Sequence, residues 1–284
     1  ACVMFSRVLR RAAGSKAIAG LVGGAAVGVT MTPFAYASDM PQNLPHYPWY
    51  HNGMNKSYDS ASLRRGYEVY RQVCATCHSM NLIHFRDLVG ATHTEAQAKA
   101  LAASYSVTDG PDSEGNMFKR PGKLTDSLPA PYPNDEFARN ANAGALPPDL
   151  SVICDARHGG PDYVMALLTG YREPPAGVTL REGLHYNPYF AGGAISMAEA
   201  LSDGLVDNED GVPATKSQMA KDVSAFLMWC AEPEQDERRL TGLKCFGGVV
   251  MATALAAYYK KHKWLIFKSR RISYTKAVKN PYGY

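Results

Sequence analysis

The stretch that decides the fold is Val73-Cys74-Ala75-Thr76-Cys77-His78, which contains the pattern C-x-x-C-H. Two thiols three positions apart can add to the two vinyl groups of one haem, and the next residue then brings an imidazole under the iron. A zinc site would need a second ligand pair at matching spacing, and a thioredoxin-like redox pair would need a βαβ context; the sequence offers neither. We therefore predict one covalent haem c, attached through Cys74 and Cys77, with His78 as the proximal iron ligand.

The residues before this motif predict an amphipathic helix. Leu63, Tyr67, Tyr70 and Cys74 recur at intervals of four, three and four, so they share one face, and Ser62 is expected to cap the helix. An ordinary core helix would show the same pattern. The two interpretations are compatible, because the haem forms much of the core of a small cytochrome.

The second axial ligand of the iron is expected to be Met197. It lies in an apolar, glycine-containing loop far beyond the C-x-x-C-H motif, which suits a segment that covers a haem. Met117, His158 and His185 remain alternatives. A methionine ligand raises the reduction potential relative to two histidines, which suits an electron carrier near the oxidising end of a chain.

Three further helices are predicted: one from a capping box at Thr94 to about Ser104, one over 161–168, and one that Ser217 caps and Pro233 ends. The segments between these helices are rich in Pro, Gly, Asn and Asp, and no region is rich in strands. Loops of that length need something to pack on, so we expect them to wrap the cofactor.

The first 37 residues have the pattern of a sorting signal. An arginine-bearing, acid-free front precedes an apolar Gly/Ala-rich stretch, which closes on Ala35-Tyr36-Ala37. This order is typical of a bipartite mitochondrial presequence, so we expect residues 1–37 to be cleaved. A second membrane span is the alternative.

Near the other end, Cys245–Tyr259 is an uncharged run of 15 residues with lysines on both sides. Lysines can snorkel, so we predict a transmembrane anchor over 241–261. The basic tail, 262–284, would then stay in the matrix and the domain 38–240 would lie across the membrane. A buried core helix is the alternative.

Charge is distributed unevenly along the chain. All 26 acidic residues but only 18 of the 30 basic residues lie in 38–259, a net charge of −8. An acidic middle excludes a nucleic-acid binder, which needs a basic face. Two acidic clusters, at 207–210 and 232–237, suggest that the domain docks a basic partner. Six cysteines are too few for a disulfide scaffold, and we expect Cys154 and Cys230 to be free buried thiols.

With these features together, the sequence resembles the cytochrome c1 family, the membrane-anchored haem subunits of the mitochondrial quinol–cytochrome c oxidoreductase, or bc1 complex. The resemblance runs from about Ser38 to Arg271. The stretches that carry it are RRGYEVY at 64–70, VCATCHSM at 73–80, RPGKL at 120–124, GALPPDLS at 144–151, ARHGG at 156–160, LLTGY at 167–171, LREGLHYNPYF at 180–190, GVPATKSQMAKDV at 211–223, KKHKW at 260–264 and KSRR at 268–271.

The resemblance implies a mostly α, class I c-type cytochrome fold with long loops around the haem, plus one C-terminal transmembrane helix. It supports Cys74 and Cys77 as the thioether attachments, His78 as the proximal ligand and Met197 as the distal ligand. This chain has Glu199-Ala200 where the family usually has proline after the ligand methionine. Arg157 and Tyr163 are implied to meet the haem propionates. The remaining pocket positions that the resemblance implies are Asn142, Ala145, Pro147, Pro148, Ile153, Leu167, Leu168, Phe190 and Ile195.

The function implied is that of an electron-transfer subunit, which accepts electrons from the Rieske iron–sulfur protein and passes them to soluble cytochrome c. The chain would make and break no bonds itself, because the enzyme is the whole complex. Cytochrome b and other bc1 subunits would be its partners, in a dimeric complex of the mitochondrial inner membrane, with the haem domain in the intermembrane space. A haem c subunit of another dehydrogenase or oxidase, or a haem-based sensor, is the alternative.

Overall fold

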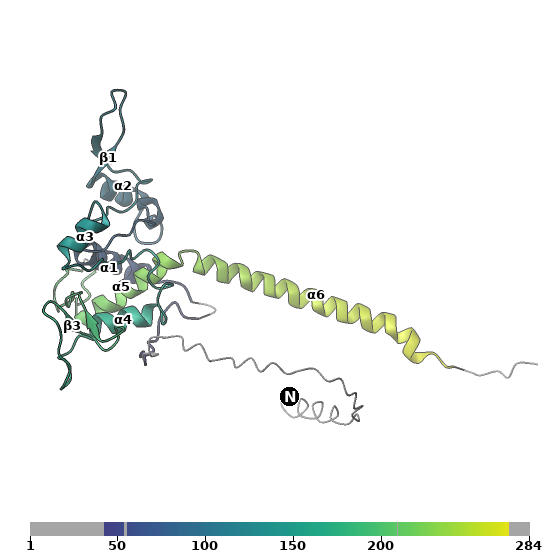
Figure 1. Cartoon of the computed structure of the whole chain (residues 1–284). Coiled ribbons are helices and arrows are strands. Elements are labelled where there is room, and N and C mark those ends of the chain that lie inside the picture. The colour runs from purple at the N-terminus through teal and green to yellow at the C-terminus, as the bar shows by residue number, and fades with distance from the viewer. Residues whose placement is uncertain (1–42, 54–55, 209, 273–284) are drawn as a thin grey trace, which may run out of the picture. The chain divides into compact units, whose positions relative to one another are not determined.

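The computed structural model describes residues 43–53, 56–208 and 210–272, so the predicted presequence lies outside the described residues. The described chain is mostly helical, which confirms the predicted fold class (Figure 1). Its elements in chain order are α1 (Ser60–Gln72), η1 (Cys74–Thr76), η2 (Phe85–Leu88), α2 (Glu95–Ala103), β1 (Ser106–Asp109), β2 (Phe118–Pro121), α3 (Asp135–Ala141), α4 (Pro161–Thr169), β3 (His185–Tyr186), β4 (Ala194–Ile195), α5 (Lys216–Ala231) and α6 (Gln235–Ser269).

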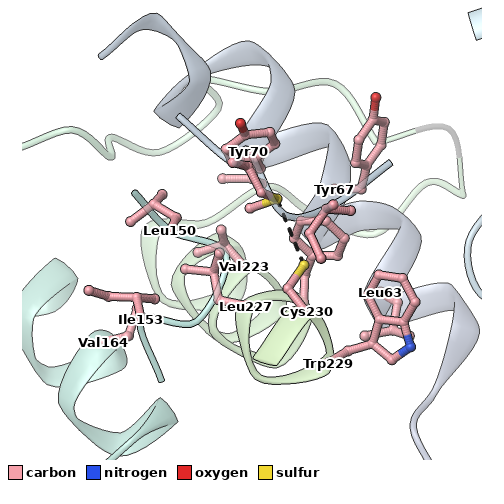
Figure 2. Packing of buried hydrophobic residues seen from close by; sticks show 14 of the residues in the cluster. Leu63, Tyr67, Tyr70, Leu150, Ile153, Val164, Val223, Leu227, Trp229 and Cys230 are labelled. Atoms are coloured by element: carbon pink, nitrogen blue, oxygen red, sulfur yellow. Dashed lines mark hydrogen bonds between the residues drawn. The ribbon is translucent and has the colours of Figure 1, made fainter. Parts of the chain in front are cut away.

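The core is built where α1 packs against α5, and α4 also packs against α5. Figure 2 shows the apolar side chains of α1 and α5 facing each other in this core. The ring of Phe226 lies 5.7 Å from that of Tyr67 and 6.1 Å from that of Tyr70. Gly66 makes the close approach possible, since a Cβ there would collide with the main-chain carbonyl of Asp222. The predicted apolar stripe is therefore the face that α1 buries.

Two predicted helix caps are wrong by two or three residues. Asp59 caps α1, because its carboxylate accepts the Ala61 N–H at 3.2 Å, while the Ser62 hydroxyl donates to Asp222 at 2.6 Å. Thr215 rather than Ser217 caps α5. In both cases a second capping residue stands just upstream, and local sequence does not decide between the two.

The other helices agree with the predictions, and the loops hold more structure than expected. Thr94 forms the predicted capping box with Gln97 at the start of α2, and α4 ends at Gly170. The long segments contain α3 and two short antiparallel pairs, β1–β2 and β3–β4. Strands of two to four residues leave little periodic signal in the sequence.

The C-terminal helix α6 is, by length and composition, able to cross a membrane. It has 35 residues, its most apolar window has a mean hydropathy of 1.5, and none of that window is buried. Exposure of the apolar side chains argues against the alternative of a buried core helix. The helix extends beyond the predicted anchor at both ends, over 235–240 and 262–269, and its first turn is charged. That turn contacts residues of the globular part: Asp236 accepts the Tyr58 N–H at 3.1 Å and Arg239 donates to the Gly53 carbonyl at 3.3 Å.

Candidate functional site

The C-x-x-C-H motif forms one tight turn directly after α1. The Cys74 carbonyl accepts the N–H of Cys77 at 3.1 Å and that of His78 at 2.9 Å. Both thiols are free and half-buried. Because α1 packs along α5, its C-terminal end delivers the two thiols and the imidazole together to the edge of the core.

The ring of His78 is oriented by a main-chain carbonyl. Its Nδ1 lies 2.8 Å from the Pro148 oxygen, and a carbonyl only accepts, so Nδ1 carries the proton. The lone pair is then on Nε2, the form in which imidazole binds a metal. Burial lowers the pKa of His78, which favours the neutral ring, although the Pro148 carbonyl and Asp149 oppose this shift. His78 is therefore prepared as a ligand.

The carboxylate of Asp149 holds the segment after the motif against the segment that carries Pro148. One oxygen accepts the Ser79 hydroxyl at 2.8 Å and the Asn81 N–H at 2.9 Å, and the other accepts the Ser151 N–H at 2.8 Å. Burial by itself would raise the pKa of Asp149, but these hydrogen bonds outweigh it and the pKa lies below its ordinary value. No pattern in the sequence predicts this role. The signal available was a single carboxylate inside an otherwise apolar, proline-rich stretch.

Among the proposed distal ligands, Met197 is placed differently from the alternatives. Its side chain is half-buried and packs against the core, as does that of Cys74. Met117 is 62% exposed, between β1 and β2, and His158 and His185 are also exposed. Burial against the core is what a thioether ligand to a haem in that core requires.

The expected pocket residues differ in how far they are buried, and two of them are hydrogen-bonded to each other. Tyr163 is half-buried; burial raises its pKa, and the guanidinium of Arg157, hydrogen-bonded to it, opposes the rise. The structure thus brings the two expected propionate partners together. The remaining positions are buried at Ile153, Leu168 and Ile195, half-buried at Asn142, Ala145, Pro147, Leu167 and Phe190, and exposed at Pro148.

Another residue that the sequence analysis missed connects two parts of this set. The Asn187 side chain is fully buried and donates to the Leu167 carbonyl at 2.8 Å, which ties the loop before β4 to α4. Nothing local marks this residue, because its partner lies 20 positions away.

The chemistry of the donor set fits haem c. Two free thiols and a neutral, oriented imidazole stand in one turn, and a thioether is available on a distant loop. In the part of the chain that the structure describes, no group of three or more His, Cys, Asp or Glu side chains could hold a metal ion.

Two further expectations concern residues outside this set. Cys154 and Cys230 are buried free thiols, as predicted, and Cys230 lies 3.8 Å from the Met80 sulfur (Figure 2). Three carboxylates of the acidic clusters form ion pairs within the chain. Asp210 pairs with Arg65 at 2.5 Å, and Glu232 and Glu234 both pair with Arg238, at 2.7 and 3.3 Å. These glutamates flank the start of α6.

Comparison with known proteins places this site in a family. The sequence model of the cytochrome c1 family matches residues 49–267. The chain is 56% identical over 261 residues to "Cytochrome c1 1, heme protein, mitochondrial" of Arabidopsis thaliana, covering 91% of this chain and 85% of that one. It is 54% identical over 236 residues to "Cytochrome c1, heme protein, mitochondrial" of Saccharomyces cerevisiae, covering 83% and 76%.

A third relative is named for its complex. The chain is 51% identical over 270 residues to "Cytochrome b-c1 complex catalytic subunit, mitochondrial" of Candida albicans, covering 91% of this chain and 93% of that one. The fold and the C-x-x-C-H turn define a c-type cytochrome with one helix that is long and apolar enough to cross a membrane. The chain belongs to the cytochrome c1 family.

Proposed function

We propose that this chain is the electron-transfer subunit of a mitochondrial bc1 complex and carries one covalent haem c. It receives electrons from the Rieske iron–sulfur protein and passes them to soluble cytochrome c. The observation that carries the proposal is the C-x-x-C-H turn, whose imidazole is oriented by the Pro148 carbonyl. The names of the relatives, mitochondrial heme proteins and a b-c1 complex subunit, support it.

Different residues of the chain would hold different parts of the haem. Cys74 and Cys77 would attach it, and His78, through Nε2, and Met197 would be its two iron ligands. Arg157, whose side chain is exposed, and Tyr163 would meet the two propionates, where a cation offsets negative charge. When bound, haem c supplies one-electron chemistry, and the thioether ligand favours the reduced state. The pocket residues exclude water and hold both ligands, so that electrons pass with little rearrangement.

The proposed topology follows from α6. Residues 1–37 are a cleaved presequence, 38–240 form the haem domain in the intermembrane space, and 241–261 cross the inner membrane. The tail, 262–284, lies in the matrix; the basic residues after the apolar run support this orientation. Cytochrome b and other subunits surround the anchor in a dimeric complex.

The test is rapid mixing of the quinol-reduced complex with oxidised cytochrome c. The c-type absorption band of this chain should bleach with the same time course as cytochrome c becomes reduced. A Met197→Leu complex should have a lower potential at this chain, so the step from the Rieske protein to this chain loses driving force, and the steady-state reduction of cytochrome c by quinol should slow. Reduction of cytochrome c while the band of this chain stays constant would contradict the proposal.

A further inference from the structure

Met197 stands in a segment with few contacts of its own. It follows β4 by two residues, and its neighbours Ser196 and Ala198 are exposed. The pair β3–β4 has only two residues in each strand, so it cannot by itself hold the segment firmly. The main chain of Met197 therefore needs anchors elsewhere.

The first anchor is the hydroxyl of Tyr171, which donates to the Met197 carbonyl at 3.0 Å. Tyr171 comes directly after Gly170, where α4 ends, and its ring meets that of His185 edge-on with centroids 6.5 Å apart. His185 is paired with Ile195 across the two strands. One side chain thus contacts the hairpin through its ring and the residue beyond the hairpin through its hydroxyl.

The second anchor lies on the other side of Met197. The Lys216 ammonium forms an ion pair with the Glu199 carboxylate, and the Lys216 N–H donates to the Asp203 carboxylate at 2.6 Å. Lys216 is the first residue of α5, which packs against α1, the helix that leads into the C-x-x-C-H turn. The segment after Met197 is therefore tied to the helix pair that carries the two thiols.

The geometry points to Tyr171 as a positioning residue for the distal ligand, assisted by the Glu199–Lys216 pair. The two anchors hold the main chain of Met197 from both sides, so that its thioether stays on the iron and external ligands do not displace it. This inference rests on the proposed function, because it takes Met197 to be the distal ligand. Tyr171 contributes more than the ion pair, since its bond is partly buried whereas the Glu199 side chain is 49% exposed.

The experiment is displacement of Met197 by added imidazole in the oxidised, purified complex, followed by loss of the far-red absorption band of methionine-ligated ferric haem. Tyr171→Phe keeps the ring and removes one hydrogen bond. The imidazole concentration for half-displacement should fall about fivefold. Tyr58→Phe is the matched control, because the Tyr58 hydroxyl also faces a main-chain carbonyl, that of Met228 at 3.4 Å, away from the site. It should leave the titration unchanged.

The ion pair is tested by charge reversal. Glu199→Lys and Lys216→Glu should each lower the half-displacement concentration about twofold, and the double variant should restore it. A Tyr171→Phe titration that superimposes on the wild type overturns the inference. If Tyr171→Phe does not accumulate, equal titrations of the wild type and both charge variants overturn it.

Met197→Leu separates the two proposals. If that variant keeps the far-red band, the distal ligand was assigned wrongly and the proposed function fails at this residue. If the band is lost in Met197→Leu, yet Tyr171→Phe behaves as the wild type, the ligand stands and only the positioning role fails.

Discussion

Replacing Asp149 by asparagine tests how the C-x-x-C-H turn is held. The substitution keeps size and shape, and the remaining oxygen can still accept the Ser151 N–H. The new amide group, however, faces the Asn81 N–H, which now donates to the carboxylate at 2.9 Å. Hydrogen bonds to a charged acceptor contribute about 1.5–3 kcal/mol, so we expect the free energy of unfolding to fall by about 2 kcal/mol. For a domain of this size that corresponds to a Tm lower by about 4–8 °C.

The assay is thermal unfolding of the haem-loaded chain in detergent, followed by circular dichroism. Asp155→Asn is the control, since Asp155 is exposed on the same stretch, and it should change stability by less than about 0.5 kcal/mol. The pKa of Asp149 is lowered by folding, so its stabilisation is present above the unfolded pKa of about 3.9 and is lost as the pH falls through the folded value. The two proteins should therefore converge in acid. Equal Tm values at pH 7 would refute the role of this carboxylate.

Three other predictions follow from the structure. Gly66→Ala should destabilise the protein by about 1–3 kcal/mol in the same assay, because the added methyl meets Asp222 and Phe226, whereas Gly242→Ala, with open space around it, should not. A chain ending at Leu240 should be soluble in membrane fractionation. A chain ending at Glu234 should have a free energy of unfolding about 2 kcal/mol lower than that of the chain ending at Leu240, because it loses the contacts of Asp236 and Arg239. Equal stability of the two chains would show that these contacts do not stabilise the domain. Reduction of cytochrome c should slow as ionic strength rises to the physiological value, where the Debye length is about 8 Å, and a rate that is flat in salt would remove electrostatic docking from the account.

The parts of the site that the sequence predicts are those in which chemistry is local. The C-x-x-C-H pattern requires its residues at adjacent positions, and the stripe ending at Cys74 follows the helical period, so both can be read without a fold. The apolar run after Lys244 also predicts a spanning helix without knowledge of the fold, because its residues are consecutive in the sequence. The helix itself begins at Gln235, upstream of the predicted anchor, because charged residues at 236–239 continue a helix in water as readily as apolar ones continue it in lipid. The bounds of the membrane-crossing part stay a prediction.

The parts that could not be predicted depend on contacts between distant residues. The bond between Tyr171 and Met197 spans 26 positions and that between Asp149 and Ser79 spans 70, and neither partner marks the other in the sequence. The acidic cluster at 232–237 is a further case. Its density suggests a docking surface, which stays a prediction, and the structure adds that Arg238, one turn along α6, pairs with two of its members. Net charge counts carboxylates without showing which of them are already paired.

The central claim is that Cys74 and Cys77 attach one haem covalently. The most direct measurement is the intact mass of the denatured, acid-extracted polypeptide, for the wild type and for a Cys74→Ser, Cys77→Ser double variant. The account predicts that the wild-type chain carries the added mass of one haem and that the double variant carries none. A wild-type chain without that added mass, or a double variant that retains it, would contradict the claim.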